Sequence, residues 1–381
     1  MSRPEHEVAD IIRRFGEDFI SIHHPNRHHL RVLRALSMCR TAALGGHKYR
    51  CDHCGREHIS YNSCRNRHCP KCQITRQAFW VEERLKNAYP VKHYHLVFTV
   101  PEALNEICLT DSKWFYNHMF VTVWDVLRSF GYSHFASESG AICILHTWGQ
   151  NLSLHPHIHC IVPALGYTLK GNMKHIGKTG KYLYPVTQLS LKFRGKFMAG
   201  VKKQLAWQNL LTDYHEQVKG AWNKQWVVYC EPSLGKPEHV VGYLGQYTHR
   251  VAITNHRIIE VGEHEVLFSL KDYSDQGKQK TTRLTGEEFL RRFCLHILPR
   301  AFVKIRHYGI YSSRFRSTIL KDKNKMIIKP LETNVERINR LTGIDICRCP
   351  RCKKGVLVYV NVVPRSRSPT LSGINSFCLQ K

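Results

Sequence analysis

Two Cys-x2-Cys pairs constrain the fold of this chain more than any other feature of its sequence. Cys51 and Cys54 form the first pair, and Cys69 and Cys72 form the second pair after 14 intervening residues. The surrounding segment 47–74 is rich in Cys, His, Asn and Arg and poor in aliphatic residues, so it is too short of apolar side chains to build its own core. Two such pairs at this distance suit one tetrahedral Zn²⁺ with four thiolate ligands. The sequence therefore predicts a small module that folds around a structural zinc ion.

Cys64 and His68 lie inside the second half of this module. They can complete a second metal site together with His47 or Cys39, or they can pack beside the zinc ligands and orient them. Of these two alternatives we favour packing and orientation.

A further pair, Cys349-x2-Cys352, lies near the C-terminus in the run CRCPRC. Together with Cys347 it offers three thiolates, whereas a zinc site of this type needs four ligands. No fourth ligand is evident nearby, so the alternatives are half of a metal site and a surface turn. The sequence slightly favours the turn.

The run HPHIHCIVP, residues 155–163, carries the most informative histidines of the chain. On a β-strand, residues two apart point to one face, so His157 and His159 project together while Ile158 turns into the core. Two imidazoles held in this way indicate a metal site for nucleic-acid chemistry, and such a site usually needs a third ligand. The candidates for this third ligand are His155, Gln150 and His95. The alternatives are a half-buried strand with solvent-facing histidines, or the second His-x-His pair that begins at His93, which we interpret as a chance pair.

Two tyrosines, Tyr243 and Tyr247, are four residues apart in the run GYLGQYTHR, whose spacing predicts a helix. Residues at i and i+4 share one face of a helix, so both phenol oxygens can reach one phosphate. A tyrosine that attacks DNA becomes linked to the phosphate and divides strand transfer into two steps. The alternative is an amphipathic helix with two packed phenols, and the histidine pair upstream favours the nucleophiles.

The charge of the chain indicates a polyanionic partner. Its 57 Lys and Arg residues exceed its 29 Asp and Glu residues and give a formal net charge of +28. Nucleic acid is the leading candidate, and an anionic membrane surface is the alternative. The predicted DNA contacts are Arg65, Arg67 and Lys71 beside the cysteines, and Lys192, Arg194, Lys196, Lys202 and Lys203 in a basic stretch.

The sequence contains no window of about 18 apolar residues, which excludes a membrane-spanning helix. Its charged start has no apolar signal-peptide core, so a cytosolic location is expected. Disulfides are rare in that compartment, and this favours metal binding by the paired cysteines.

Apolar spacing predicts helices and strands in a mixed order that is typical of an α+β fold. The predicted helices cover 6–45, within which a second helix covers 28–43, and 75–89, 102–130, 190–219 and 287–298. The predicted strands cover 93–101, 141–148, 157–163, 226–230 and a hairpin near 256–270. We expect three parts: N-terminal helices with the zinc-binding domain (1–90), a catalytic core (91–310), and a C-terminal region with a loose tail (311–381).

In the order in which they occur, several runs resemble the two-tyrosine HUH transposases of the insertion-sequence-91 type. These runs are CDHCG, SCRNRHCPKCQ, HLVFTVP, HPHIHCIVP, YLGQYTHRVAI and LPRAFVKIRHYG, and they span roughly residues 50–310. The resemblance implies a zinc-binding domain followed by an HUH nuclease core with an antiparallel sheet. It also implies that His157 and His159 are the HUH pair, that Tyr243 and Tyr247 are the nucleophiles, and that Cys51, Cys54, Cys69 and Cys72 belong to the zinc module.

The implied activity is metal-dependent nicking and transfer of single-stranded DNA through 5′-phosphotyrosine intermediates, as in rolling-circle transposition. Mg²⁺ or Mn²⁺ would serve catalysis, and the partners would be single-stranded element ends and target DNA in the bacterial cytoplasm, at the nucleoid. The alternatives are a zinc-ribbon DNA-binding protein without catalysis and a rolling-circle replication initiator. A transposase with a carboxylate triad is disfavoured, because no convincing Asp–Asp–Glu set stands at strand ends.

Overall fold

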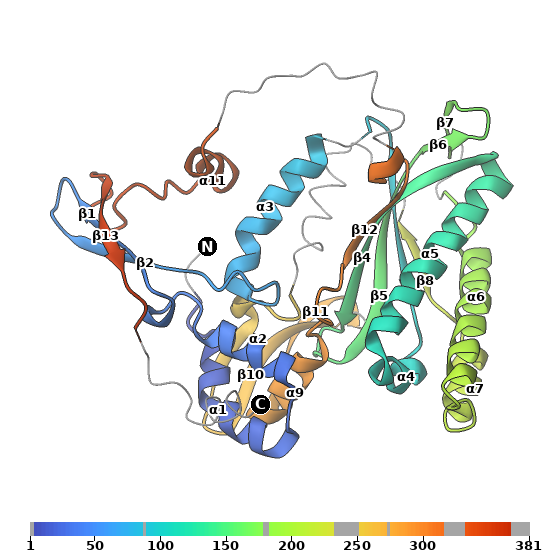
Figure 1. Ribbon diagram of the computed structural model, residues 1–381, viewed down its shortest axis with the longest axis horizontal. Helices are drawn as coiled ribbons and strands as arrows, with labels where there is room; N and C mark the ends of the chain where they lie inside the picture. The colour runs from blue at the N-terminus through green and yellow to red at the C-terminus, as the bar shows by residue number, and fades with distance from the viewer. Residues whose placement is uncertain are drawn as a thin grey trace.

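The computed structural model shows an α+β protein built around a curled antiparallel sheet (Figure 1), which confirms the fold class predicted from the sequence. It describes residues 4–86, 89–177, 183–231, 251–272, 275–315 and 332–366. The predicted tyrosine helix lies outside these residues.

The central sheet has the strand order β7-β6-β4-β5-β3-β8, and β12 pairs with β4. Its strands are β3 (His93–Thr99), β4 (Ser137–Trp148), β5 (Leu154–Pro163), β6 (Leu165–Thr168), β7 (Met173–His175), β8 (Val228–Glu231) and β12 (Ile305–Gly309). The pairings of β5 with β3 and with β4 are both antiparallel. The histidine strand therefore lies inside the sheet, where neighbours on both sides fix its register.

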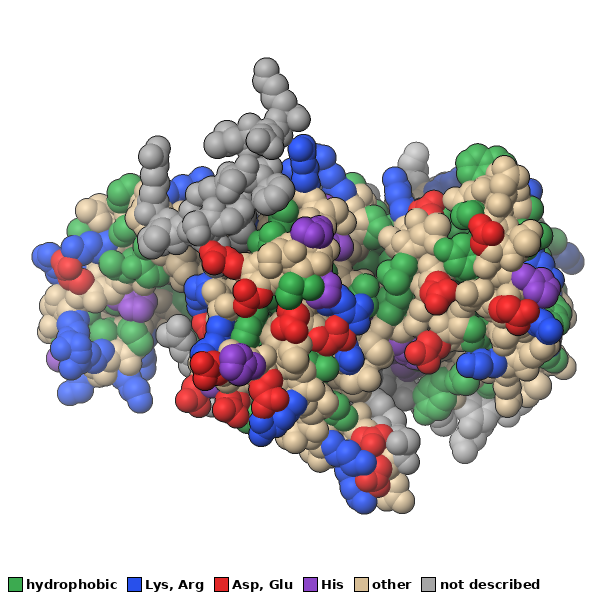
Figure 2. Space-filling model, turned by 90° about the horizontal axis from the view of Figure 1, so that it is seen from below, with side chains coloured by type: hydrophobic (Ala, Val, Ile, Leu, Met, Phe, Trp, Pro, Cys, Tyr) green, Lys and Arg blue, Asp and Glu red, His purple; other side chains and the backbone are tan. Residues whose placement is uncertain are grey.

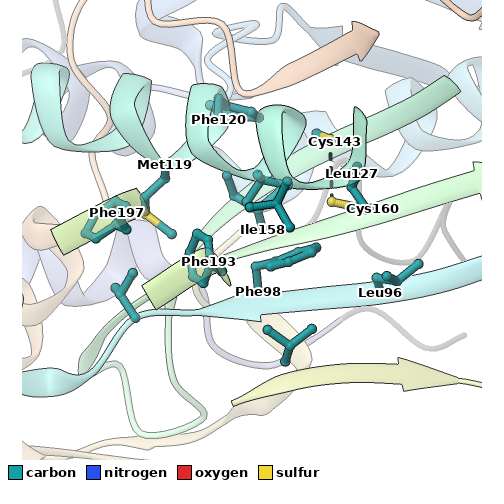
Figure 3. Close-up of a cluster of buried hydrophobic side chains, with 14 of the residues drawn as sticks. Leu96, Phe98, Met119, Phe120, Leu127, Cys143, Ile158, Cys160, Phe193 and Phe197 are labelled. Atoms are coloured by element: carbon teal, nitrogen blue, oxygen red, sulfur yellow. Dashed lines mark hydrogen bonds between the residues drawn. The ribbon is translucent and has the colours of Figure 1, made fainter. Parts of the chain in front are cut away.

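Helices cover one face of this sheet. They are η2 (Glu102–Leu104), α4 (Asn105–Thr110), α5 (Ser112–Phe135), α6 (Val186–Trp207) and α7 (His215–Asn223). Ile158 of β5 and Phe98 of β3 point toward Phe193 and Phe197 of α6 (Figure 3), and all four side chains are buried in one hydrophobic core. Alternate residues of β5 thus anchor the strand, which leaves His157 and His159 on the opposite face.

The opposite face of the sheet is partly covered by residues far apart in the sequence. Ile144 and Ile161 of the sheet pack with Tyr311, and Trp80 of α3 (Pro70–Lys86) lies against them. This small apolar cluster occupies one end of the face, and the histidines lie toward the other end of the same strands.

The N-terminal helices α1 (Val8–His23) and α2 (Arg27–Ser37) form a second core with the sheet β11-β10-β9. That sheet consists of β9 (Ile258–Val261), β10 (Glu265–Asp272) and β11 (Lys278–Thr285), which follow η3 (Asn255–Arg257) and lead into α9 (Gly286–Leu295). The apolar residues of α1 recur at helical spacing and are buried, which explains its single buried face. Asn26 caps α2 by accepting hydrogen bonds from the backbone amides of His28 and His29.

A third, smaller sheet joins the two ends of the chain, with the strand order β13-β1-β2. It contains β1 (Gly46–Cys51), β2 (Glu57–Tyr61) and β13 (Leu357–Val363), with η1 (Ala42–Leu44) before it and α11 (Asn334–Thr342) between the core and β13. β13 lies beside β1 in Figure 1, although about 300 residues of chain separate them. The C-terminal region is thus built into the N-terminal module, and the division at residues 90 and 310 remains a prediction.

Candidate active site and cysteine clusters

Three histidines meet on the face of the central sheet opposite α5 and α6, where His146 and His159 are buried and His157 is half-buried. His157 and His159 come from β5, and His146 comes from β4, where it stands directly opposite His157 in the strand register. One ring nitrogen from each residue lies within 4.8 Å of those of the other two. This arrangement can hold one metal ion with three imidazole ligands.

The third histidine of the cluster is therefore His146, and none of the three candidates predicted from the sequence belongs to the cluster. The His155 side chain is exposed, although its backbone carbonyl accepts a hydrogen bond from Nδ1 of His157 at 2.7 Å. Gln150 accepts a hydrogen bond from Arg257 through its backbone carbonyl. His146 escaped detection because its partner in the cluster lies on the neighbouring strand rather than two residues away.

His95 acts on the cluster indirectly. Its Nε2 lies 2.9 Å from Nδ1 of His159, and both rings are buried. When Nδ1 of His159 donates this hydrogen bond, its other ring nitrogen keeps the lone pair that a metal requires. In the same way, the His155 carbonyl accepts a hydrogen bond from Nδ1 of His157, which leaves the lone pair of the other ring nitrogen available to a metal. His93 is buried away from the cluster, where its Nε2 lies 2.6 Å from the Tyr311 hydroxyl.

Beside the cluster lies a small cavity with a positive lining. Trp148 stacks on His146 with ring centroids 4.6 Å apart, and it also lines this cavity. The cavity measures about 20 Å³, which is room for about one water molecule. Its lining is Arg67, His68, Trp148, Val251, Ala252, Phe293, His296, Leu298 and Lys304.

Burial keeps the histidines of this cavity neutral. It lowers the pKa of His296 to about 4, and burial together with Arg67 lowers the pKa of His68 to about 3. Burial also lowers the pKa of Lys304 to about 8, with a smaller contribution from Arg67. The positive charge near the histidine cluster thus comes from Arg67 and Lys304 at neutral pH.

Two of the basic residues predicted to contact DNA from the cysteine module make internal contacts. Arg67 donates hydrogen bonds to the backbone carbonyls of Pro299 and Phe302, and so ties the module to the core. Lys71 forms a 2.6 Å ion pair with Glu7 in which both side chains are mostly buried. Arg65 is exposed and has a positive φ of 54°.

The basic stretch on α6 lies on the helical side of the sheet, opposite to the histidine cluster. Lys192 lies over the ring of Phe130, and Arg194 and Lys202 lie over the ring of Trp222. Lys196 is paired with Asp125 at 3.4 Å, and Lys203 is exposed. That these side chains contact DNA remains a prediction.

The cysteines form two clusters among the described residues, rather than the one site that their spacing predicted. Cys69 and Cys72 lie with Cys39 and Cys64, whereas Cys51 and Cys54 lie with Cys349 and Cys352. The prediction of one shared zinc ion is therefore wrong, because each pair finds its partners outside the other pair. Cys64 is part of a cluster rather than packing beside one, and His68 lines the cavity described above. Cys347 belongs to neither cluster.

Comparison with known proteins identifies the class of this protein. Residues 11–100 match the family model described as "Transposase zinc-binding domain", and residues 140–318 match the model described as "Putative transposase". The first range contains the whole cluster of Cys39, Cys64, Cys69 and Cys72 together with Cys51 and Cys54 of the other cluster, and the second range contains the histidine cluster. The chain is thus a DNA-processing enzyme of the transposase class, and its zinc-binding domain supports a structural zinc ion.

Two relatives establish the family. The chain is 37% identical over 385 aligned positions to "Putative transposase y4qJ" of Sinorhizobium fredii, covering 95% of this chain and 96% of the relative. It is 25% identical over 293 positions to "Transposase for insertion sequence element IS801" of Pseudomonas savastanoi pv. phaseolicola, covering 72% and 68%. No solved structure gives a significant match. The chain belongs to the insertion-sequence-91-type transposases with an N-terminal zinc-binding domain.

DNA follows as the partner of a transposase. None of the described helices has the length and apolar content needed to cross a membrane.

Proposed function

We propose that this transposase is an HUH-type endonuclease and strand transferase that nicks single-stranded DNA and moves it by rolling-circle transposition. The observation that carries the proposal is the cluster of three histidines on the central sheet. The substrates are single-stranded element ends and target DNA, which the protein meets in the cytoplasm at the nucleoid. Residues 91–310 form the catalytic part, between a zinc-binding part (1–90) and a C-terminal part (311–381).

The histidine cluster suits a divalent ion. His146, His157 and His159 would hold the ion, while His95 and the His155 carbonyl fix the orientation of two of these rings. A bound divalent ion would polarise the scissile phosphate and stabilise the charge that develops on the leaving oxygen. Imidazole nitrogen is a better ligand for Mn²⁺ than for Mg²⁺, which prefers an all-oxygen shell. Of these two ions, Mn²⁺ should therefore support more activity at low concentration.

The two proposed nucleophiles, Tyr243 and Tyr247, lie outside the described residues, but the described chain on either side supports their role. β8 ends at Glu231 and is separated from the histidine strand only by β3. At the other end, Val251 lines the cavity together with Trp148, which stacks on His146. Only three residues separate Tyr247 from Val251, so a span of at most about 14 Å joins their Cα atoms.

The reaction conserves phosphodiester bonds. The phenol oxygen of one tyrosine attacks the phosphorus and forms a phosphotyrosine, while the bond from phosphorus to the 3′ oxygen breaks. The 3′ oxygen leaves and takes up a proton, and the 5′ phosphate stays on the tyrosine. A 3′ hydroxyl can later attack the phosphotyrosine and release the phenol. A second tyrosine allows a new strand to be taken while the first is still held.

The test is the formation of a covalent adduct. Purified protein is incubated with labelled single-stranded DNA that carries the element terminus, with Mn²⁺ or Mg²⁺, and the product is separated under denaturing conditions. We expect an adduct in the wild type and none in the Tyr243→Phe/Tyr247→Phe double variant, because phenylalanine removes only the phenol oxygen. The two single variants should differ, with one stopping the first nick and the other impairing completion.

The alternatives give different results in this experiment. DNA binding without an adduct would identify a zinc-ribbon DNA-binding protein without catalysis. An adduct that persists in the double variant would place the nucleophile on another residue. A replication initiator would form the adduct on an origin sequence and fail to join element ends to a target strand.

A further inference from the structure

The C-terminal cysteine pair meets the first N-terminal pair, and neither family match covers the C-terminal one. Cys349 and Cys352 lie beyond both matched ranges, which end at residues 100 and 318. We propose that Cys51, Cys54, Cys349 and Cys352 bind a second structural zinc ion, which fastens the C-terminal region to the N-terminal module.

The sulfur positions fit a tetrahedral ion. Sγ of Cys51 lies 3.7 Å from Sγ of Cys352, and Sγ of Cys54 lies 3.9 Å from Sγ of Cys349. Zinc bonded to four sulfurs at about 2.3 Å separates them by about 3.8 Å, whereas a disulfide bond joins two sulfurs at about 2.0 Å. The other cluster has the same spacing, with 3.6 Å from Cys39 to Cys72 and 3.7 Å from Cys64 to Cys72.

The two cysteine pairs have the same backbone turn. The amide of Gly55 donates to the carbonyl of Cys51 at 3.0 Å, and the amide of Lys353 donates to the carbonyl of Cys349 at 3.0 Å. The residue after each second cysteine is left-handed, with φ of 67° at Gly55 and 55° at Lys353. A non-glycine residue adopts this conformation at a cost. Two matched turns that face each other, one of them strained, indicate a shared requirement to aim four sulfurs at one point.

Backbone amides also point at the sulfurs. The amide of Cys54 donates to Sγ of Cys51 at 3.5 Å, and the amide of Gly355 donates to Sγ of Cys352 at 3.4 Å. Such hydrogen bonds stabilise negative charge on sulfur, as a metal-bound thiolate requires. A Cβ at Gly355 would lie 2.5 Å from Sγ of Cys51, so only glycine permits this approach.

The strands next to the cluster hold the two turns together without the metal. β13 pairs with β1 from Gly46↔Val363 to Cys51↔Leu357. Asp52 extends this pairing, because its amide donates to the carbonyl of Val356 and its Oδ1 accepts from the amide of Val356 at 2.8 Å. The site is therefore positioned by contacts that are independent of the sulfurs.

The charge around the cluster complements a four-thiolate site. Four thiolates and one Zn²⁺ carry a net charge of about −2, and exposed basic side chains on both turns offset it. Basic side chains gather over this module at the left of Figure 2. Those close to the cysteines in sequence are Arg56, Arg348, Arg351, Lys353 and Lys354.

The test is the zinc content of the full-length protein, measured by plasma mass spectrometry against the protein concentration. We expect two zinc ions per chain, one for each cysteine cluster. Cys349→Ser/Cys352→Ser should lose one ion and keep the other, and Cys39→Ser/Cys64→Ser should lose the opposite ion. Cys347→Ser is the matched control, because Cys347 lies in the same run but outside the cluster, and it should keep both.

A second measurement covers variants that fail to fold. Wild-type protein is titrated with a chelator, and the alkylation of each cysteine is followed by mass spectrometry. Cys51, Cys54, Cys349 and Cys352 should become reactive together as one ion leaves. One zinc ion per wild-type chain, or alkylation of Cys349 and Cys352 at the same rate with and without bound zinc, would overturn the proposal. Neither outcome depends on nuclease activity, so the proposed function is tested separately.

Discussion

The histidine cluster and the ribbon formed by β1, β2 and β13 are assembled in opposite ways. The histidines come from two strands that follow each other in the chain, and β4 and β5 place His146 and His157 opposite each other. The ribbon brings Cys54 and Cys349 together from positions 295 residues apart. The catalytic candidate is thus local in sequence, whereas the ribbon depends on both ends of the chain. The two regions should respond differently to substitution.

The largest expected difference is in thermal stability, between variants of the two cysteine clusters. Structural zinc contributes about 10–16 kcal/mol of apparent binding free energy to small modules, and Cys39, Cys69 and Cys72 share a core with α1, α2 and α9. Cys64→Ser should therefore lower the thermal midpoint of the whole N-terminal part. Cys352→Ser should weaken the attachment of β13, which its pairing with β1 still supports, and leave that core folded. Thermal unfolding followed by circular dichroism, with limited proteolysis, measures both effects.

Cys347→Ser is the control for this comparison and should behave as the wild type. Equal losses of thermal midpoint in Cys64→Ser and Cys352→Ser would show that the two clusters form one cooperative unit.

The next effect concerns the histidine cluster. His146→Ala should reduce single-strand cleavage about 10²- to 10³-fold, the usual loss when one group that stabilises transition-state charge is removed. His155→Ala should cleave nearly normally, because its backbone carbonyl still accepts the hydrogen bond from His157. Single-turnover cleavage of labelled DNA gives the rates, and fluorescence anisotropy should show unchanged DNA binding. A greater loss in His155→Ala than in His146→Ala would reverse this assignment of the third ligand.

A smaller effect is expected from His95, which contacts His159 of the cluster. His95→Ala should weaken metal binding about 10- to 100-fold, as is typical when the partner of a ligating histidine is lost. The measurement is the Mn²⁺ concentration that gives half-maximal cleavage, and saturating Mn²⁺ should restore most of the rate. A rate that stays low at every Mn²⁺ concentration would mean that His95 takes part in the reaction more directly.

The free energy of unfolding should depend on pH through His296, with an effect of similar size. Burial lowers its pKa from 6.5 to about 4, so in this range the unfolded chain binds a proton that the folded chain does not. This contribution to stability is complete above about pH 6.5 and falls toward pH 4 by about 1.4 kcal/mol per pH unit. His296→Gln should reduce the pH dependence of the unfolding free energy by this amount. Denaturant titrations at pH 7 and pH 5 measure it, and identical pH slopes in both proteins would contradict the assignment.

The smallest effect concerns α6, which lies on the far side of the sheet from the histidines. If Lys202 and Lys203 each contact a phosphate of single-stranded DNA, the Lys202→Ala/Lys203→Ala variant should lower the logarithmic salt dependence of binding by about 1.4. Affinity measured between about 50 and 200 mM salt gives the slope. An unchanged slope would remove α6 from the DNA-binding surface.

The sequence predicted the parts of the fold that depend on local patterns. The alternation of apolar and polar residues in β5 identified the strand, the shared face of His157 and His159, and the burial of Ile158. Helical spacing identified α1 and α2. These features follow from the period of the element itself.

The sequence could not predict contacts that depend on strand register and chain closure. His146 is recognised only when β4 is paired with β5 at one register, since a shift by one residue would turn it to the other face. Cys349 and Cys352 looked like an incomplete site because their partners lie in the first pair rather than nearby. Spacing alone also favoured one ion for Cys51, Cys54, Cys69 and Cys72, since their 14-residue separation fits a known pattern.

The pairing of β1 with β13 also determines when the ribbon can fold during synthesis. A ribosome adds about 5–20 residues per second, and Cys349 follows Cys54 by 295 residues. Synthesis of Cys349 and Cys352 therefore follows that of Cys51 and Cys54 by on the order of 15–60 s. A copy of the gene that stops before codon 349 would yield a chain with every histidine of the cluster but an unfinished ribbon. The ribbon can close only after β13 has been translated.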